Sequence, residues 1–248
     1  MHIEQARRYL YTASAVPATG EITFPFQQYI DAKASSALPA TGGRATARID
    51  DYHVDKIISI GSAVTQLVGS FSKEENAFNT LVTTTIDGLN LLDVVTADRC
   101  VARLTSRHLK EDPNKESPGP EASIVFLGCH FENLRIAGFQ AVIEYNEDLL
   151  ANVDTFEGMR AHCPKNKIPS TESRGMLSTS IIKNISGLVG VKVQGNRIEI
   201  PQFGVVYLGE VIAKPSTRRL TMIRAELGCS LYGNVSICQI DGNGTEYP

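Results

Sequence analysis

Short runs in which apolar or small side chains alternate with polar ones are the feature that most constrains how this chain folds. The run Ala45-Thr46-Ala47-Arg48-Ile49-Asp50 alternates in this way, and the stretches 63–69 and 80–86 do likewise while being rich in Thr, Val and Ile. Successive side chains of a β-strand point to opposite faces, so such runs predict half-buried strands. We expect further strands at 123–128, 139–145, 204–213, 219–227 and 230–239.

A two-residue hairpin is predicted around Gly195-Asn196. Alternating arms, residues 191–194 and 197–200, flank this pair. Gly and Asn are the residues that adopt the positive φ angles of a tight hairpin turn. Pro201 has no backbone N–H, so it limits the outgoing strand to an edge or an end of a sheet.

Helix signals point to one segment, Asn146 to His162. Asn146 suits the N-cap position, and the acidic side chains that follow it suit the first turn of a helix. Four apolar side chains then share one face at helical spacing: Leu149, Leu150, Val153 and Phe156. We expect about one helix in the whole protein.

Three segments are predicted to be flexible loops: residues 32–43, 108–121 and 163–175. They are made of small or polar residues with prolines or paired glycines. Strand-like patterns of the same kind continue on both sides of each segment, so none of them resembles a linker between domains. We therefore expect a single β-rich domain that covers residues 1–248.

The chain matches itself without gaps when it is shifted by 37 residues. Ile49 to Val54 then falls on Ile86 to Leu91, and a shortened third copy begins at Phe131. The shared order predicts a strand that enters a tight corner and leaves as a second strand. The expected fold is all-β, either a β-sandwich or a solenoid-like stack of repeated β units around one core.

The charge balance excludes a general nucleic-acid binder. The chain carries 24 basic and 27 acidic side chains, a net charge of −3. Binding to phosphate backbones needs a basic surface that displaces counterions. The same balance gives no reason to expect an anionic membrane as partner.

Neither targeting signals nor the cysteines point outside the cytoplasm. Charged residues follow Met1 at once, and no apolar stretch has the length of a signal peptide or a membrane-spanning helix. The five cysteines are odd in number, and no two have the CxxC spacing of a zinc site. We expect reduced, half-buried thiols and a cytoplasmic protein; a processed secreted form would have the same sequence features.

Three segments resemble bacterial surface proteins called choice-of-anchor P. The first is Thr85-Ile86-Asp87-Gly88-Leu89-Asn90-Leu91-Leu92, followed by Val95-Thr96-Ala97-Asp98. The others are Asn133-Leu134-Arg135-Ile136-Ala137-Gly138 and Ile200-Pro201-Gln202-Phe203-Gly204-Val205-Val206. The resemblance lies in patches between residues 80 and 240, and it implies a β-rich bacterial protein without any functional residue to carry over.

No GxxxxGK(S/T) or GxGxxG phosphate-binding motif, no HExxH metalloprotease motif and no GxSxG nucleophile motif occurs in the chain. The candidate pair is His130 and Glu132, which point the same way if residues 130–132 form a strand. A reactive Cys163 beside His162 is not favoured, because the end of a helix does not lower the pKa of a thiol. An acidic corner would be able to hold a cation: Asp50, Asp51 and Asp55 around Tyr52 and His53.

Two further stretches suggest interactions. The segment 62–85 has two alternating arms around a polar centre, as does a hairpin that inserts into a membrane; an ordinary soluble hairpin needs the same alternation. Aromatic residues gather near the N-terminus, and we expect them to cover one end of the core, or to form a patch for a partner if they are exposed: Tyr9, Tyr11, Phe24, Phe26 and Tyr29.

These observations favour a non-catalytic structural or interaction protein of bacterial origin that self-associates through β edges. No catalytic, cofactor-binding or metal-binding residue is assigned, and no cofactor is expected. One alternative is a small-molecule enzyme or carrier with a pocket between sheets, using His130 and Glu132. Another is a soluble β pore-forming protein that inserts residues 62–85, the only case with a membrane partner.

Overall fold

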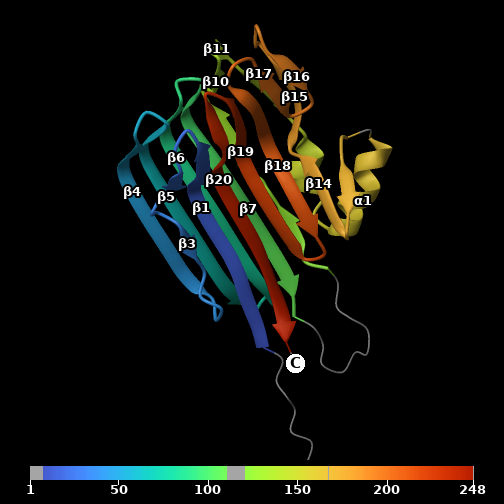
Figure 1. Ribbon diagram of the computed structural model, residues 1–248. Helices are drawn as coiled ribbons and strands as arrows, with labels where there is room; N and C mark the ends of the chain where they lie inside the picture. The colour runs from blue at the N-terminus through green and yellow to red at the C-terminus, as the bar shows by residue number, and fades with distance from the viewer. Residues whose placement is uncertain (1–7, 111–120, 167, 248) are drawn as a thin grey trace, which may run out of the picture.

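The computed structural model describes residues 8–110, 121–166 and 168–247, and these form two large antiparallel sheets packed face to face (Figure 1). The chain is therefore all-β, as the alternation predicts, and of the two architectures expected the structure has the sandwich. A third, two-stranded sheet and two short helical segments lie beside the sandwich. None of the helices formed by the described residues has the length and apolar character needed to cross a bilayer.

Sheet A is built from the two ends of the chain. Its main path runs β13-β14-β18-β19-β20-β1-β2, with β17 also pairing with β18, β16 with β17 and β3 with β1. Its strands are β1 (Arg8–Phe24), β2 (Gln28–Asp31), β3 (Ser36–Ala37), β13 (Thr171–Ser173), β14 (Met176–Ser180), β16 (Lys192–Gln194), β17 (Arg197–Ile200), β18 (Gly204–Lys214), β19 (Thr217–Cys229) and β20 (Leu231–Tyr247).

Sheet B is a meander of four long strands with short additions on one side. Its path runs β11-β10-β7-β6-β5-β4, and β8 and β9 also pair with β7. Its strands are β4 (Gly43–Val54), β5 (Ile58–Ser72), β6 (Ala77–Leu91), β7 (Val95–Leu109), β8 (Ser123–Val125), β9 (His130–Glu132), β10 (Arg135–Ile136) and β11 (Phe139–Gln140). The small third sheet pairs β12 (Val142–Tyr145) with β15 (Ile182–Ser186).

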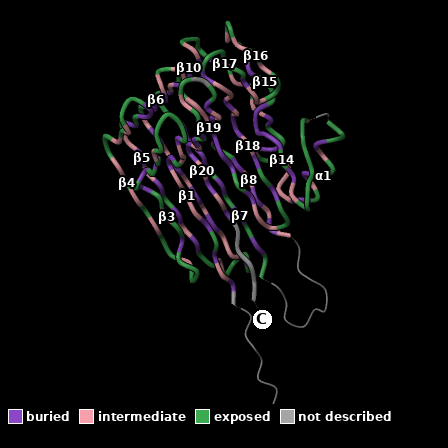
Figure 2. The backbone as a smooth tube through the Cα atoms, viewed as in Figure 1, coloured by how far each residue is buried: buried purple, intermediate pink, exposed green. Residues whose placement is uncertain are grey.

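One continuous cluster of buried apolar side chains lies between the sheets (Figure 2). Strands β1 and β20 of sheet A pack on β5, β6 and β7 of sheet B. The approach is close: the Cys238 thiol lies 3.4 Å from the carbonyl oxygen of Thr84, across the core. Burial of apolar surface on this scale is the main force that holds such a sandwich together.

A row of interruptions crosses sheet B. Along each pair of neighbouring long strands, the residues pair in one register from end to end. One residue pair is missing from each register, and the missing pairs lie next to one another across the sheet. Asn133, between β9 and β10, continues the row and donates from Nδ2 to Asp98 Oδ2 at 2.6 Å. The row consists of Asp51, Gly61, Gly88, Asp98 and Asn133.

The row reverses which residues of each strand face the core. In β4, odd-numbered residues such as Ile49 face inward before Asp51, and even-numbered ones such as Tyr52 do so after it. β6 makes the reverse change at Gly88. Positive φ angles at Asp51, Gly88 and Asn133 absorb the change, because a residue in this conformation interrupts the regular pleat.

The internal repeat therefore has a different structure from the one predicted. Its three copies carry Asp51, Gly88 and Asn133 at the same place, but none of these turns the chain from one strand into the next. Asp51 and Gly88 lie at the interruption within β4 and β6, and Asn133 lies between the short strands β9 and β10. The 37-residue period is the step from the β4–β5 hairpin to the β6–β7 hairpin, and the hairpins lie side by side in one sheet rather than stacking as a solenoid.

The predicted helix 146–162 is in fact two shorter elements. A π-helical turn, η1 (Asp148–Asn152), ends at Val153, and helix α1 (Phe156–Lys165) begins after Thr155. Thr155 Oγ1 accepts a hydrogen bond from Gly158 N at 3.1 Å, which makes Thr155 the N-cap. The apolar spacing crosses the break because Leu149 and Phe156 both face the core from separate elements.

The hairpin prediction is confirmed: β16 and β17 pair Gln194 with Arg197 around Gly195-Asn196. The loop predictions are partly wrong, because 32–43 contains β3 and 163–175 contains the end of α1 and β13. These strands are two and three residues long, too short for a pattern of alternation to reveal them. Most of the predicted loop 108–121 lies outside the described residues.

Candidate functional site

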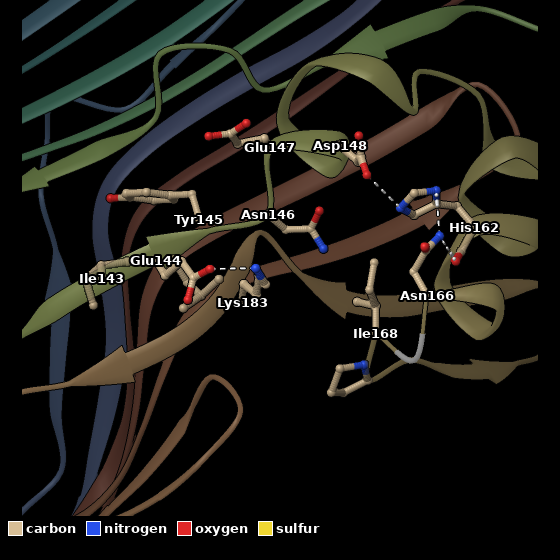
Figure 3. A pocket seen from close by; sticks show the side chains of 12 residues that line it. Ile143, Glu144, Tyr145, Asn146, Glu147, Asp148, His162, Asn166, Ile168 and Lys183 are labelled. Atoms are coloured by element: carbon tan, nitrogen blue, oxygen red, sulfur yellow. Dashed lines mark hydrogen bonds and ion pairs between the residues drawn. The ribbon is translucent and has the colours of Figure 1, made fainter.

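A polar pocket of about 900 Å³ lies beside the sandwich, where the β12–β15 sheet meets η1 and α1 (Figure 3). The end of β12 and the turn after it supply residues 144–148, while α1 and its C-cap supply His162 and Asn166. Ile168, Pro169 and β15 form the rest of the wall. The pocket therefore depends on three segments that are far apart in the sequence.

Asn146 is the most buried polar side chain of this wall, at 8% exposure. Its Oδ1 accepts from Leu149 N at 3.3 Å, which fixes the orientation of the amide and starts η1. Within the part of the chain that the structure describes, its Nδ2 donates to no protein atom, and this nitrogen is open to the pocket rather than sealed in the core. Figure 3 shows this nitrogen directed toward the space between Lys183 and Asn166.

His162 is held from both sides. Asn166 Nδ2 lies 3.1 Å from His162 Nδ1 and also donates to the His162 carbonyl oxygen, so Nδ1 is the acceptor. The ring proton is then on Nε2, which lies 3.4 Å from Asp148 Oδ2 without forming a hydrogen bond to it. Both ring nitrogens face protein groups, so this imidazole is not placed to take a proton from a substrate.

A cross-strand ion pair occupies another side of the pocket. Lys183 Nζ lies 2.5 Å from Glu144 Oε1. Hydrogen bonding to Glu144, with the negative charges of Glu144 and Glu147, raises the pKa of Lys183. The ammonium is therefore already balanced by a carboxylate.

The outer edge of sheet B is a second candidate site. β4 is its last strand and lies at the left of Figure 1, and among the described residues its backbone pairs with β5 alone. Its outward side chains include Arg44, Arg48 and Asp50. Arg48 binds Asp50 through two nitrogens at 2.7 and 2.9 Å, whereas Arg44 has no ion-pair or hydrogen-bond partner among the described residues.

The predicted pair His130 and Glu132 does share one face of β9. His130 Nε2 lies 3.4 Å from Glu132 Oε1, and Arg99 Nη1 approaches the same carboxylate at 3.6 Å. Both side chains are about half exposed on the outer face of sheet B, and neither lines the 900 Å³ pocket. The geometry is that of a surface charge network and gives no support to an enzyme that uses this pair.

The acidic corner does not gather its carboxylates. Asp50 turns to Arg48, while Asp51 and His53 are widely exposed and 4.0 Å apart. Hydrogen bonding to Arg48 lowers the pKa of Asp50. No group of three His, Cys, Asp or Glu side chains able to hold a metal ion occurs anywhere in the described ranges.

Four cysteines are free and buried rather than half-buried: Cys100, Cys129, Cys163 and Cys238. Burial raises the pKa of the Cys129 thiol to about 12, and it also raises the pKa of Cys163. A thiol with a raised pKa is a poor nucleophile, which agrees with the prediction for Cys163. The side chain of Cys229 lies outside the described residues.

The N-terminal aromatic residues do not form one cluster. Tyr9 and Tyr11 are buried at one end of β1, where Tyr9 stacks on Phe78 with ring centroids 4.1 Å apart. Phe24, Phe26 and Tyr29 lie at the other end and are exposed. A strand of 17 residues separates positions that the sequence places close together.

The segment 62–85 belongs to the β5–β6 hairpin at the centre of sheet B. Each of the two strands has 15 residues, and their inward side chains are part of the core. Membrane insertion of this hairpin is a prediction that would require the sandwich to open.

The sequence interpretation missed the pocket. Its wall joins β12, β15 and α1, and it depends on backbone pairing such as that of Glu144 with Asn184. No local residue spacing predicts that pairing. The one local signal is the polar run Asn146-Glu147-Asp148, which by sequence alone predicts the start of a helix.

Comparisons with known proteins bear on the family of this chain. The model of a family described as a domain of unknown function, DUF8256, matches residues 9–169 and 158–214. No curated protein and no solved structure matches. The chemistry of both candidate sites therefore rests on this chain's own residues.

Proposed function

The chain belongs to the DUF8256 family of domains of unknown function, and from that premise we propose that it is a non-catalytic structural protein that self-associates through strand β4. The observation that supports this proposal is the length of the unpaired edge. β4 has 12 residues, whereas β2, β11 and β13 at the other ends of the two sheets have two to four.

Short edge strands are one way in which proteins prevent edge-to-edge pairing, and a long edge is a template for another strand. Residues 43–50 of β4 have an uninterrupted register with β5, and Asp51 then interrupts it. This segment is consequently the part of the edge that a second strand can pair with over its whole length.

A second copy of the chain fits this edge in one antiparallel register. With Ala47 opposite Ala47 of the other copy, Arg44 of each copy lies opposite Asp50 of the other. Asp50 would then lie between its own Arg48 and the Arg44 of the second copy. The two otherwise unpaired Arg44 side chains each gain a carboxylate, and each exposed pair contributes on the order of 0.2–1 kcal/mol.

Neighbouring registers are opposed by charge. A slip of two residues in one direction places Arg44 opposite Arg48, and in the other it places Arg48 opposite Arg48. A slip of one residue puts inward side chains opposite outward ones. Like charges that face each other across strands are destabilising, so the order of charges along β4 favours the register centred on Ala47.

Sedimentation velocity over a range of protein and salt concentrations measures the association. We expect a reversible dimer that weakens as salt rises, because exposed ion pairs are screened. Arg44→Glu, which places a second carboxylate opposite Asp50, should weaken the dimer. Lys56→Glu makes the same charge change in the turn after β4 and should leave the association constant unaltered by comparison.

Engineered cysteines measure the register. In the proposed dimer the two copies of residue 47 face each other at roughly 4.5–5.5 Å between Cα atoms, within reach of a disulfide. Ala47→Cys should therefore cross-link under mild oxidation, whereas Ala45→Cys should not. A wild-type monomer at every concentration would overturn the proposal, and cross-linking by Ile49→Cys in place of Ala47→Cys would overturn the register.

The resemblance to choice-of-anchor P proteins, the bacterial origin and the cytoplasmic location stay predictions from the sequence. The alternatives, a carrier built on His130 and Glu132 and a pore formed by residues 62–85, have no specific geometric support.

A further inference from the structure

The side-chain amide nitrogen of Asn146 is a donor in the pocket beside the sandwich that the protein leaves unused. The Asn146 side chain is almost completely buried, and its Oδ1 is fixed by Leu149 N, so Nδ2 cannot turn away to another partner without losing that bond. The nitrogen itself is reached from the pocket, so an acceptor that enters the pocket can contact it. An oxygen atom from outside the protein, entering the pocket, is the natural acceptor for this N–H group.

The charges of the wall favour a cation. Glu144, Glu147 and Asp148 are acidic, and Lys183 is the one basic side chain of the described lining apart from His162. Lys183 is engaged by Glu144 at 2.5 Å, and His162 Nδ1 faces the amide of Asn166. The excess negative charge therefore resides on Glu147 and Asp148.

The shape and ligands of the pocket favour an organic cation over a metal ion. No three His, Cys, Asp or Glu side chains converge in the described chain, whereas a bound Ca²⁺ or Zn²⁺ takes several protein ligands. Ile168 and Pro169 supply an apolar wall, and the volume of about 900 Å³ accommodates a small organic molecule.

We propose that this pocket binds a small organic ammonium ion that carries a carbonyl or hydroxyl oxygen next to its charged nitrogen. The oxygen accepts a hydrogen bond from Asn146 Nδ2, and the ammonium group lies in the negative field of Asp148 and Glu147. The proposal is independent of association through β4, because the pocket lies on the other side of the molecule from that edge (Figure 1).

Glycinamide is a minimal probe, since it has an ammonium group beside an amide carbonyl. Binding is followed by the NMR shifts of the pocket amides as the probe is added. Two fragments separate the contributions: ethylammonium has the charge without the oxygen, and acetamide has the oxygen without the charge. We expect glycinamide to bind at least about tenfold more tightly than either, because a charge-assisted contact is combined with a hydrogen bond.

Two substitutions test which side chain contacts the oxygen of the probe and which contacts its ammonium group. Asn146→Asp keeps the oxygen that Leu149 N needs but replaces the donor by a second acceptor. It should weaken glycinamide binding and strengthen ethylammonium binding, a crossing that a loss of folding cannot produce. Asp148→Asn should weaken both ammonium probes, while Asp55→Asn, in the distant β4–β5 turn, should weaken neither.

The proposal is overturned if glycinamide gives no saturable shift at any concentration, or if acetamide binds as well as glycinamide. It is also overturned if Asn146→Asp affects glycinamide and ethylammonium in the same direction. Thermal unfolding of each variant by circular dichroism shows that the compared proteins are folded.

Discussion

The guanidinium of Arg218 donates from Nη1 to the carbonyl oxygen of Ile124 at 2.8 Å, joining β19 of sheet A to β8 of sheet B. The same nitrogen lies 3.1 Å from the Val153 carbonyl oxygen, between η1 and α1. Arg218 is fully buried, and its Nε and Nη2 have no hydrogen-bond partner among the described residues. One side chain thus holds three elements together at the cost of a buried charge.

This buried charge should make stability depend on pH at the alkaline end. Burial lowers the pKa of Arg218 to about 10, well below the ordinary value of a guanidinium, against the partial opposition of Glu121 and Asp154. Between these values the unfolded chain binds more protons than the folded one, so this residue's contribution to stability rises with pH. At pH 11 the gain over pH 7 is on the order of 1 kcal/mol.

Denaturant unfolding of the wild type and Arg218→Met at both pH values isolates this contribution. The free energy of unfolding of the wild type, relative to Arg218→Met, should increase between pH 7 and pH 11. Arg219→Met is the matched control, because Arg219 is half exposed and paired with Asp241 at the surface. An equal change for both variants would mean that Arg218 does not titrate in this range.

Substitutions at Gly88 test whether the interruption in sheet B requires a residue that tolerates a positive φ angle. A Cβ at this position would make ordinary contacts with Gly61, at 3.4 and 3.5 Å, but φ is +65°. Gly88→Ala should therefore lower the free energy of unfolding by about 1–2 kcal/mol through backbone strain. Gly88→Asn should cost less, because Asn tolerates this conformation better. If Asn costs more than Ala, crowding rather than φ decides the residue at this position.

A substitution at Gly242 tests how closely the two sheets approach each other at this position. A Cβ there would lie 2.2 Å from Leu104 Cδ2, and Leu104 is fully buried. Overpacking should make Gly242→Ala less stable by about 1–3 kcal/mol in thermal or denaturant unfolding. Gly228→Ala, where the nearest atom is 3.7 Å away, should have a much smaller effect.

A double-mutant cycle that combines Gly242→Ala with Leu104→Val locates the clash. The smaller side chain at position 104 makes room for the added methyl group, so the double mutant should lose less stability than the sum of the two single losses. Strict additivity would show that the strain at Gly242 arises elsewhere.

Local periodicity predicted many of the strands, but not the long strands β1 and β7. The alternation in 45–50, 63–69 and 80–86 lies within β4, β5 and β6, because a half-buried sheet leaves a period of two in any strand that it contains. The Gly195-Asn196 hairpin was equally accessible, since its turn depends on the two residues that form it. The break of the helix at Val153 was not predicted, because the apolar spacing of Leu149 and Phe156 continues across it while both side chains are buried from separate elements.

The sequence by itself determined that this is an all-β protein and where most of its strands lie, because strand formation follows from the order of polar and apolar side chains along a few residues. Only the tertiary structure decided that the repeat marks a row across one sheet, that Arg44 lies unpaired on an open edge, and that Asn146 faces a pocket. Those relationships join residues such as Asp98 with Asn133, and Glu144 with Lys183, that are 35 and 39 positions apart. Contacts at such separations depend on how strands pair and sheets pack, and the sum of many weak burial and pairing energies settles them rather than any local pattern.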